Sequence, residues 1–524
     1  MQYRRLLLSL IAFGLLVMQL NAQPKTNPRT KALTGSRSTK VTPEPAPDME
    51  QELRGVTTYS GTFADGATYL IEVPRNWNGT LLLYSHGYVF PGDPNPAQDT
   101  GTAGGGPEDP LSRFYLLTHG YALAGSSYAK TGYAIHEALP DQIAVLDTFD
   151  SLIGQPSRTI AWGHSLGGII TAGLAQKYPE RFSGALPMCG VLAGSVGIWN
   201  EFLDAAFAFN TLLASGSGLQ VVNITDPDTN FAIAEQVLTS AQASPEGRAR
   251  IALVAALMDL PGWIDPPFVT SPEPGPTDYA TQEANQFLEF QQIVDFALFF
   301  FARAEMEGRA GGNPSWNTGI DYKKQLALSI DSAEVQALYQ QAGLSLDADL
   351  DTLNNAPRIA ADPAAVHYLS ENLIFNGQIQ IPVLTLHTTD DDVVAVQDEQ
   401  AYANVVAKTN HSALLRQTFV HRAGHCNFTE AETIAALQAL IQRLDTGTWQ
   451  GLDPADLNSA AKRLGARLNV LFPGLPVLAP AFVDYAPAPF LRPFDAFSPF
   501  LLPFDVLASG AATNKTSDAR RASR

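Results

Sequence analysis

Residues 161–170 read AWGHSLGGII and place Ser165 between two glycines, at the point where one sequence pattern gives way to another. The residues before it, 158–162, are β-prone, whereas 166–178 follow a helical pattern. We therefore expect a sharp strand-to-helix turn, in which the glycines allow close backbone packing and the hydroxyl projects away from the sheet. The helix N-terminus there favours a developing negative charge. On this interpretation Ser165 is a nucleophile; the alternative is a glycine-rich turn made for packing.

The segments around this turn alternate between short apolar runs and helical patterns. Strands are expected at 80–87 (TLLLYSHG), 121–128 (YALAGSSY) and 184–190 (GALPMCG), and a helix at 141–154 (DQIAVLDTFDSLIG). Upstream, Asp65 and Gly66 form a hairpin turn signal between two β-prone runs. This alternation predicts an α/β fold, with a mostly parallel sheet flanked by helices.

The alternation stops after residue 190. The pattern from 191 to 376 is mostly helical, most clearly over 286–308, where Phe287, Phe290, Val294, Leu298 and Phe301 recur at helical spacing. Strands resume at 381–387 (IPVLTLH) and 414–421 (LLRQTFVH), and Thr429 and Glu432 in the helix after them are placed for a capping box. The sequence therefore predicts a large helical insertion between the strands of one α/β domain.

The two ends of the chain have different compositions. Residues 1–22 carry two arginines ahead of a short apolar run, which is typical of a secretory signal peptide; an uncleaved membrane anchor is the alternative. The next residues are poor in large apolar side chains and are expected to be a disordered leader. The expected divisions are a signal peptide 1–22, a leader 23–50, a first core part 51–190, a helical insertion 191–376, a second core part 377–448 and a Pro/Phe-rich extension 449–524.

The net charge of the chain argues against some classes of binding partner. The chain has 33 basic and 52 acidic side chains, a net charge of -19, which repels nucleic acid and anionic membrane surfaces. We expect a secreted or periplasmic protein that binds no nucleic acid and does not stay inserted in a membrane. The Pro/Phe-rich extension either lies along the domain as an extended arm or mediates association, because proline forbids a regular helix there.

A serine hydroxyl becomes a good nucleophile when a histidine accepts its proton, and the histidine usually needs an acid to orient it. His425 lies in the loop between the last strand and the capped helix, from which a base can reach over the strand ends. His421 is the reserve candidate. His164 adjoins the serine and should point elsewhere, and His86 is expected to be structural.

The candidate acids are Asp390, Asp391 and Asp392, which directly follow a predicted buried strand. A carboxylate aimed across the strand ends would orient the imidazole and stabilise its protonated form. The alternative is a calcium site, although calcium loops usually alternate their oxygen ligands and contain glycine.

These motifs together resemble the α/β-hydrolase superfamily over residues 55–190 and 377–446. HGY, GHSLGG, the acidic run after VLTLH and GHC occur in the family's order, and the chain is similar to exported bacterial serine hydrolases of the esterase or lipase kind with a helical cap. In the family's acid loop, Asp391 takes the catalytic place. Thr388 stands where glycine is usual and Asp392 where proline is common, so Asp390 stays an alternative.

The resemblance also implies roles for backbone groups and for the two cysteines. The N–H groups of Tyr88 and Leu166 would form the oxyanion hole. Cys189 and Cys426 would lie near the same edge of neighbouring strands, where a disulfide would hold the loop of the candidate base. Two free buried thiols are the alternative.

The sequence thus predicts an exported serine hydrolase that cleaves carboxylic esters through an acyl-enzyme, acting on a small-molecule or lipid-like ester with no metal and no organic cofactor. Ser165 would attack, His425 would move the proton and Asp391 would orient His425. The helical insertion would cover the strand ends, its phenylalanines either lining an apolar chamber or packing within the insertion.

Two other functions stay open. A serine peptidase of the aminopeptidase or prolyl type would need cap carboxylates for a substrate amine, and the candidates Glu283, Glu289, Glu305 and Glu307 could equally be a solvated face. A non-catalytic binding protein on the same scaffold would be expected to lack at least one of the three catalytic residue types, and all three are present.

Overall fold

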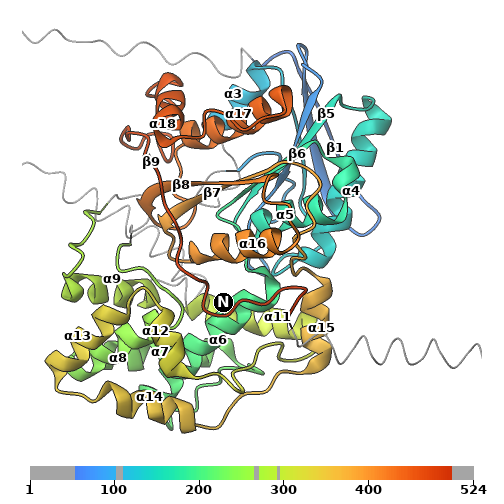
Figure 1. Cartoon of the computed structure of the whole chain (residues 1–524). Helices are drawn as coiled ribbons and strands as arrows, with labels where there is room; N and C mark the ends of the chain where they lie inside the picture. The colour runs from blue at the N-terminus through green and yellow to red at the C-terminus, as the bar shows by residue number, and fades with distance from the viewer. Residues whose placement is uncertain (1–52, 102–109, 265–270, 292–295, 499–524) are drawn as a thin grey trace, which may run out of the picture. The chain divides into compact units, whose positions relative to one another are not determined.

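The two segments that resemble a hydrolase, together with a short strand from the C-terminal extension, build one sheet in the computed structural model, which describes residues 53–101, 110–264, 271–291 and 296–498. Within these residues the sheet has nine strands in the order β1-β2-β4-β3-β5-β6-β7-β8-β9 (Figure 1). The central strands β3 to β8 pair in parallel, whereas β1 with β2, β2 with β4 and β8 with β9 pair antiparallel. The predicted α/β class with a mostly parallel sheet is therefore confirmed.

The strands are β1 (Val56–Thr62), β2 (Thr68–Pro74), β3 (Thr80–Ser85), β4 (Ala122–Ser126), β5 (Arg158–His164), β6 (Gly184–Met188), β7 (Val383–Asp390), β8 (Leu415–Ala423) and β9 (Phe482–Val483). The expected hairpin joins β1 to β2, where the Asp65 carboxylate accepts a hydrogen bond of 3.0 Å from the Ala67 amide. Gly66 between them has a φ of 98°, which explains why glycine occupies the turn.

Several expected segments lie outside the described residues. These are the signal peptide 1–22, the leader 23–50, Val294 and the last residues of the extension 449–524. No helix among the described residues has the length and apolar character that a membrane span requires.

Helices cover both faces of the sheet (Figure 1). One layer holds α4 (Ile135–Leu152), α5 (Leu166–Lys177) and α16 (Gln397–Lys408), and the other α3 (Pro110–Thr118), α17 (Glu430–Thr446) and α18 (Pro454–Arg463). Leu81 and Leu83 of β3 are buried in the core of the first layer and Leu82 in that of the second. Strands buried on both faces read as continuous apolar runs, as the sequence patterns indicated.

Two helix boundaries show how local signals act. The predicted capping box begins α17: the Thr429 side chain accepts from the Glu432 amide, and the Glu432 side chain accepts from the Thr429 amide. The expected helix at 141–154 instead starts at Ile135 and has Pro140 inside it. Because proline usually marks a helix start or a break, the sequence pattern predicted a helix that begins too late.

Between β6 and β7 the described residues form helices and no strand. These are α6 (Gly194–Leu212), α7 (Pro227–Gln242), α8 (Pro245–Ala256), α9 (Tyr279–Gln291), the π-helix η2 (Ala297–Ala302), α11 (Arg303–Ala310), α12 (Tyr322–Leu328), α13 (Ser332–Ala342), α14 (Leu346–Asn355) and α15 (Pro363–Glu371). Figure 1 shows most of these green and yellow helices gathered together, apart from the two layers that flank the sheet.

The stretch 286–308 is not one regular helix, because it contains the end of α9, the π-helix and the start of α11. Its aromatic side chains contact one another: the Phe290 and Phe296 ring centroids are 5.8 Å apart, and those of Phe296 and Phe300 are 5.7 Å apart. All three rings are buried. These phenylalanines therefore pack within the insertion, which is the second of the two roles considered for them.

The C-terminal extension begins with the helix α18, so the expectation that it contains no regular helix is wrong: Pro454 lies at the helix start, where proline is tolerated. Beyond β9 the extension continues as an extended arm. After β9 pairs with β8, buried residues return at Phe490, Leu491 and Phe494. Between them Arg492 donates to the Asp204 carboxylate on α6 and, at 2.7 Å, to the Trp316 carbonyl. The arm thereby joins the far edge of the sheet to the helical insertion.

Candidate active site

Ser165 stands alone between β5, which ends at His164, and α5, which begins at Leu166. Its backbone has φ 57° and ψ −123°, a conformation that side-chain-bearing residues rarely adopt. The Ser165 amide donates to the Met188 carbonyl at 3.0 Å, which ties the turn to β6. A Cβ at Gly163 or Gly167 would collide with the Ser85 carbonyl oxygen, so both glycines are required by close packing against β3.

The structure brings His425 to this turn. Its Nε2 lies 2.8 Å from Ser165 Oγ, and its side chain is 21% exposed, although the two residues are 260 positions apart. Ser165 follows β5 and His425 follows β8, and β6 and β7 lie between these two strands in the sheet. The loop that carries His425 therefore reaches Ser165 across the strand ends. The imidazole is within the distance at which it can accept the hydroxyl proton.

Asp391 lies on the other side of the imidazole. His425 Nδ1 is 2.8 Å and 2.9 Å from the two Asp391 carboxylate oxygens. The same carboxylate accepts hydrogen bonds from the amides of Val393, at 3.0 Å, and Val394, at 2.8 Å. Burial opposes its ionisation, but the facing histidines and these amides hold the pKa of Asp391 below its ordinary value.

The neighbouring acids and the reserve base have other partners. Asp390 accepts a hydrogen bond of 2.7 Å from Thr389, and burial raises its pKa. Burial and the charge of Asp391 raise the pKa of Asp392 to about 7. His421 faces Glu273, with 3.1 Å between Nε2 and the carboxylate, rather than Ser165. The structure thus brings together Ser165, His425 and Asp391.

His164 and His86 support the strand ends. His164 is buried and its Nδ1 lies 3.2 Å from the Tyr84 hydroxyl, and burial lowers its pKa to about 3. His86 is stacked on Tyr128, with ring centroids 3.9 Å apart, and its Nδ1 is 2.8 Å from the Gly87 carbonyl. Burial lowers the pKa of His86 to about 4, so both rings are neutral near pH 7.

The expected oxyanion donors lie beside Ser165. Leu166 begins α5, where the amides of the first helical turn have no carbonyl partner within the helix. A Cβ at Gly87 would lie 3.4 Å from the Cβ of Ser165, which places the loop carrying Tyr88 against the serine. Because His86 Nδ1 lies against the Gly87 carbonyl, it fixes the peptide group whose N–H belongs to Tyr88.

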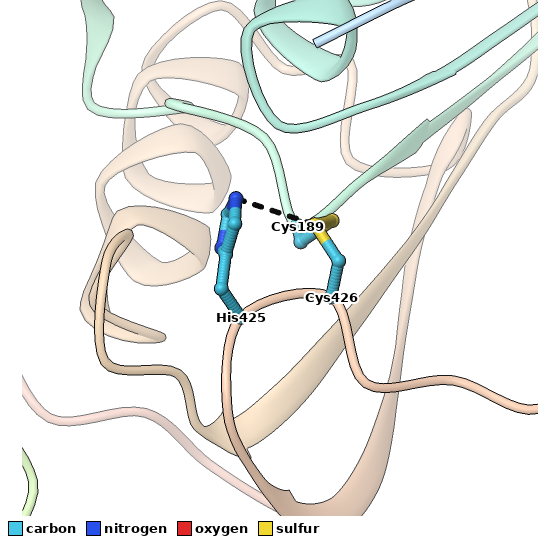
Figure 2. Close-up of side chains that lie close together, drawn as sticks. All are labelled: Cys189, His425 and Cys426. Carbon is cyan, nitrogen blue, oxygen red and sulfur yellow. Dashed lines mark hydrogen bonds between the residues drawn. A yellow bond between two sulfur atoms is a disulfide. The ribbon is translucent and has the colours of Figure 1, made fainter. Parts of the chain in front are cut away.

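A disulfide joins Cys189 to Cys426, with 5.3 Å between their Cα atoms. Figure 2 shows the imidazole of His425 beside this bridge, and its Nε2 is 3.4 Å from Cys426 Sγ. The bridge connects the end of β6, next to the Ser165 turn, with the loop of His425. Although these three residues gather potential metal ligands, the disulfide consumes both thiolates that a metal would need.

The glutamates considered for binding a substrate amine have partners within the protein. Glu305 accepts from the Tyr133 amide at 2.9 Å and pairs with Arg309. Glu307 accepts from the Ile224 amide at 3.0 Å, and Glu283 from the Gln242 side chain at 3.3 Å. Glu283, Glu289 and Glu307 are all buried, so they do not form a solvated face.

One residue that sequence reasoning treated only as a strand end belongs to the site. His387 of β7 is fully buried, and its Nε2 lies 3.5 Å from Asp391 Oδ2. Its Nδ1 lies 3.3 Å from the Glu399 carboxylate on α16. A signal was present, because Thr385 and His387 alternate with apolar residues in the first part of a buried strand, and a buried polar group needs a partner.

Known proteins that are similar to this chain include an amidase and esterases. No protein-family model matches the chain. The o-phthalyl amidase of Xanthobacter agilis is 32% identical over 449 residues, which cover 80% of this chain and 93% of that protein.

Among solved structures, an esterase from Aspergillus oryzae is 14% identical, with a TM-score of 0.39, over 76% of this chain and 81% of its own. The rice cell wall degrading esterase LipA from Xanthomonas oryzae is 14% identical, with a TM-score of 0.32, over 76% and 94%. From the amidase identity and the sheet topology, the chain is a hydrolase that belongs to the family of the o-phthalyl amidase within the α/β-hydrolase superfamily.

Proposed function

We propose that this protein is an exported serine hydrolase that cleaves carboxylic esters through an acyl-enzyme intermediate. One observation carries the proposal: His425 touches the Ser165 hydroxyl with one ring nitrogen and the Asp391 carboxylate with the other. This chain of contacts is the arrangement that turns a serine hydroxyl into a nucleophile.

In the first half of the reaction, Ser165 Oγ attacks the carbonyl carbon as His425 Nε2 accepts its proton. Asp391 accepts a hydrogen bond from His425 Nδ1, which fixes the tautomer and stabilises the imidazolium. The amides of Tyr88 and Leu166 stabilise the negative oxygen of the tetrahedral intermediate. His425 then gives its proton to the leaving alcohol. A water, activated by the same imidazole, releases the acid and restores the hydroxyl.

Export is proposed on the apolar run within residues 1–22 and is supported by the disulfide, because such bonds persist in oxidising compartments. The substrate is a small-molecule or lipid-like ester, which reaches the partly exposed His425 side chain.

Labelling with a fluorophosphonate probe tests the proposal. The probe should modify the native protein at the peptide that contains Ser165, and Ser165→Ala should abolish both labelling and ester turnover. Ser157→Ala is the matched control, since this residue is an exposed serine in the loop before β5. Equal labelling of native protein and Ser165→Ala would reject the mechanism, and a folded native protein without labelling or turnover would favour a binding protein.

A second candidate is amide cleavage, which the similarity to an o-phthalyl amidase favours. The same acyl-enzyme chemistry serves amides and esters, so the fold and the triad do not choose between them. The choice between ester and amide cleavage is tested by comparing kcat/KM for an ester and an amide of the same acyl group, first acetyl and then phthalyl. A higher kcat/KM for the phthalyl amide than for the phthalyl ester would replace esterase by amidase.

A further inference from the structure

A second histidine lies behind the acid of the site. His387 of β7 is fully buried, and both of its ring nitrogens face acceptors. Nε2 is 2.9 Å from the Val394 carbonyl and 3.5 Å from Asp391 Oδ2, and Nδ1 is 3.3 Å from Glu399 Oε1. A neutral imidazole has one N–H, so it would leave one of these nitrogens with its lone pair against an oxygen. The surroundings therefore favour the doubly protonated imidazolium.

Glu399 is held in place to meet this charge. Its Oε2 accepts a hydrogen bond of 2.6 Å from the Thr385 hydroxyl, and Gln417 on β8 donates to the same oxygen. Glu399 is fully buried on α16, where a carboxylate requires a cationic or hydrogen-bonding partner. Burial opposes a charge on His387, but the Glu399 hydrogen bond, the charges of Asp391 and Glu399 and the Val394 carbonyl raise its pKa to about 9.

We propose that His387 is a positioning residue for the reaction: as a buried imidazolium paired with Glu399, it keeps Asp391 ionised and lowers the proton affinity of His425. This inference rests on the proposed function, since it concerns the base that Ser165 requires. A cation behind Asp391 offsets part of the negative charge that His425 faces, and so disfavours a proton on His425. The acid limb of the kcat/KM–pH profile, where the base becomes protonated, should therefore depend on His387.

Other charged groups surround these two histidines and are considered in the same balance. Asp398 on α16 also interacts with the charge of His387, and its own pKa is raised to about 7 by burial. On the other side, His425 faces Asp392 and the neutral, buried His164. Since Asp392 and Asp398 both titrate near neutral pH, variants are compared with the native protein over the whole pH range rather than at one pH.

The test measures kcat/KM against pH for a chromogenic acetyl ester in His387→Gln, Glu399→Gln and the double variant. In His387→Gln, the acid limb of the kcat/KM–pH profile should shift to higher pH by about one unit, the usual effect of one close charge. Glu399→Gln should move the acid limb in the same direction by less. Without Glu399 the His387 imidazolium loses its paired carboxylate and its proton, so this change removes the more distant anion together with the cation. The double variant, which leaves no unpaired buried carboxylate, should match Glu399→Gln. KM should change less than kcat.

The matched control is His411→Gln, which removes a histidine outside the site, in the segment between α16 and β8. Its acid limb should coincide with the native one. An unchanged acid limb in His387→Gln, with activity reduced equally at every pH, would assign His387 a merely structural role and overturn the proposal.

An unchanged limb in Glu399→Gln would overturn the proposal as well, and this variant keeps the test decisive if His387→Gln does not fold. Fluorophosphonate labelling distinguishes a failure of the His387 proposal from a failure of the proposed function. Variants that label at Ser165 while the limb stays in place contradict the role of His387 alone, whereas loss of serine dependence in the native protein contradicts the proposed function.

Discussion

Removing the disulfide between Cys189 and Cys426 is expected to destabilise the protein strongly. The bridge joins residues 237 positions apart and closes a loop that holds the helical insertion, β7 and β8. For a loop of this length, the entropy of closure that is removed from the unfolded chain corresponds to about 5 kcal/mol at 25 °C. Cys189→Ala/Cys426→Ala should lower the free energy of unfolding by about that amount. It should also lower kcat, since the His425 loop loses its covalent link to the end of β6.

The assay is urea unfolding, followed by tryptophan fluorescence and by circular dichroism, in the native protein and the double variant. Both cysteines are buried, so reductant should leave the bridge intact in the folded protein and cut it once urea opens the chain. Reductant should therefore move the native curve onto that of the variant and leave the variant curve unchanged. A difference under about 1 kcal/mol between the oxidised native protein and the variant, with equal kcat, would refute this reasoning.

Three further outcomes are expected. Asp391→Asn should lower kcat about 10³- to 10⁴-fold with KM little changed, whereas Asp390→Asn should stay within about threefold, as steady-state kinetics of ester hydrolysis would show. Burial raises the pKa of Asp259 from 3.8 to about 7, so its contribution to stability is full below about pH 4 and is lost as the pH rises through 7. Asp259→Asn should therefore become more stable than the native protein by up to about 4 kcal/mol at pH 8 but not at pH 4, and a pH-independent difference in urea unfolding would contradict this. Arg492→Met leaves the Asp204 carboxylate buried without its cation and should cost roughly 3–5 kcal/mol, whereas adding Asp204→Asn should recover part of the loss; equal losses in both variants would argue against the ion pair.

The sequence patterns predicted the elements whose causes are local. The Ser165 turn was recognisable because the β-prone run, the glycines and the helical pattern are contiguous, and the structure shows why the glycines are needed. The β1–β2 hairpin and the capping box at Thr429 likewise depend on residues within a few positions of one another. The order of the strands and of the run of aspartates along the chain was then enough to propose which distant side chains meet.

Features that depend on distant packing were out of reach. Local patterns left three consecutive aspartates open, and the choice of Asp391 came from the resemblance to the hydrolase family; in the structure the pairing of β7 with β8 shifts register at this point, between Thr388 and Asp390. The pairing of His387 with Glu399 depends on how α16 packs on the sheet, and that of Arg492 with Asp204 on the path of the arm. The π-helix Ala297–Ala302 departs from the regular helical spacing, and a periodic pattern does not reveal such a departure.

The most direct test of the account is to trap the covalent intermediate. The native protein is mixed with excess p-nitrophenyl acetate, quenched in acid at the end of the initial burst, digested and analysed by mass spectrometry. The account predicts one acetyl group per chain, on Ser165, in an amount equal to the burst of nitrophenol. Steady turnover with no acetyl group on Ser165, or with the same acetylated peptides in Ser165→Ala, would contradict it.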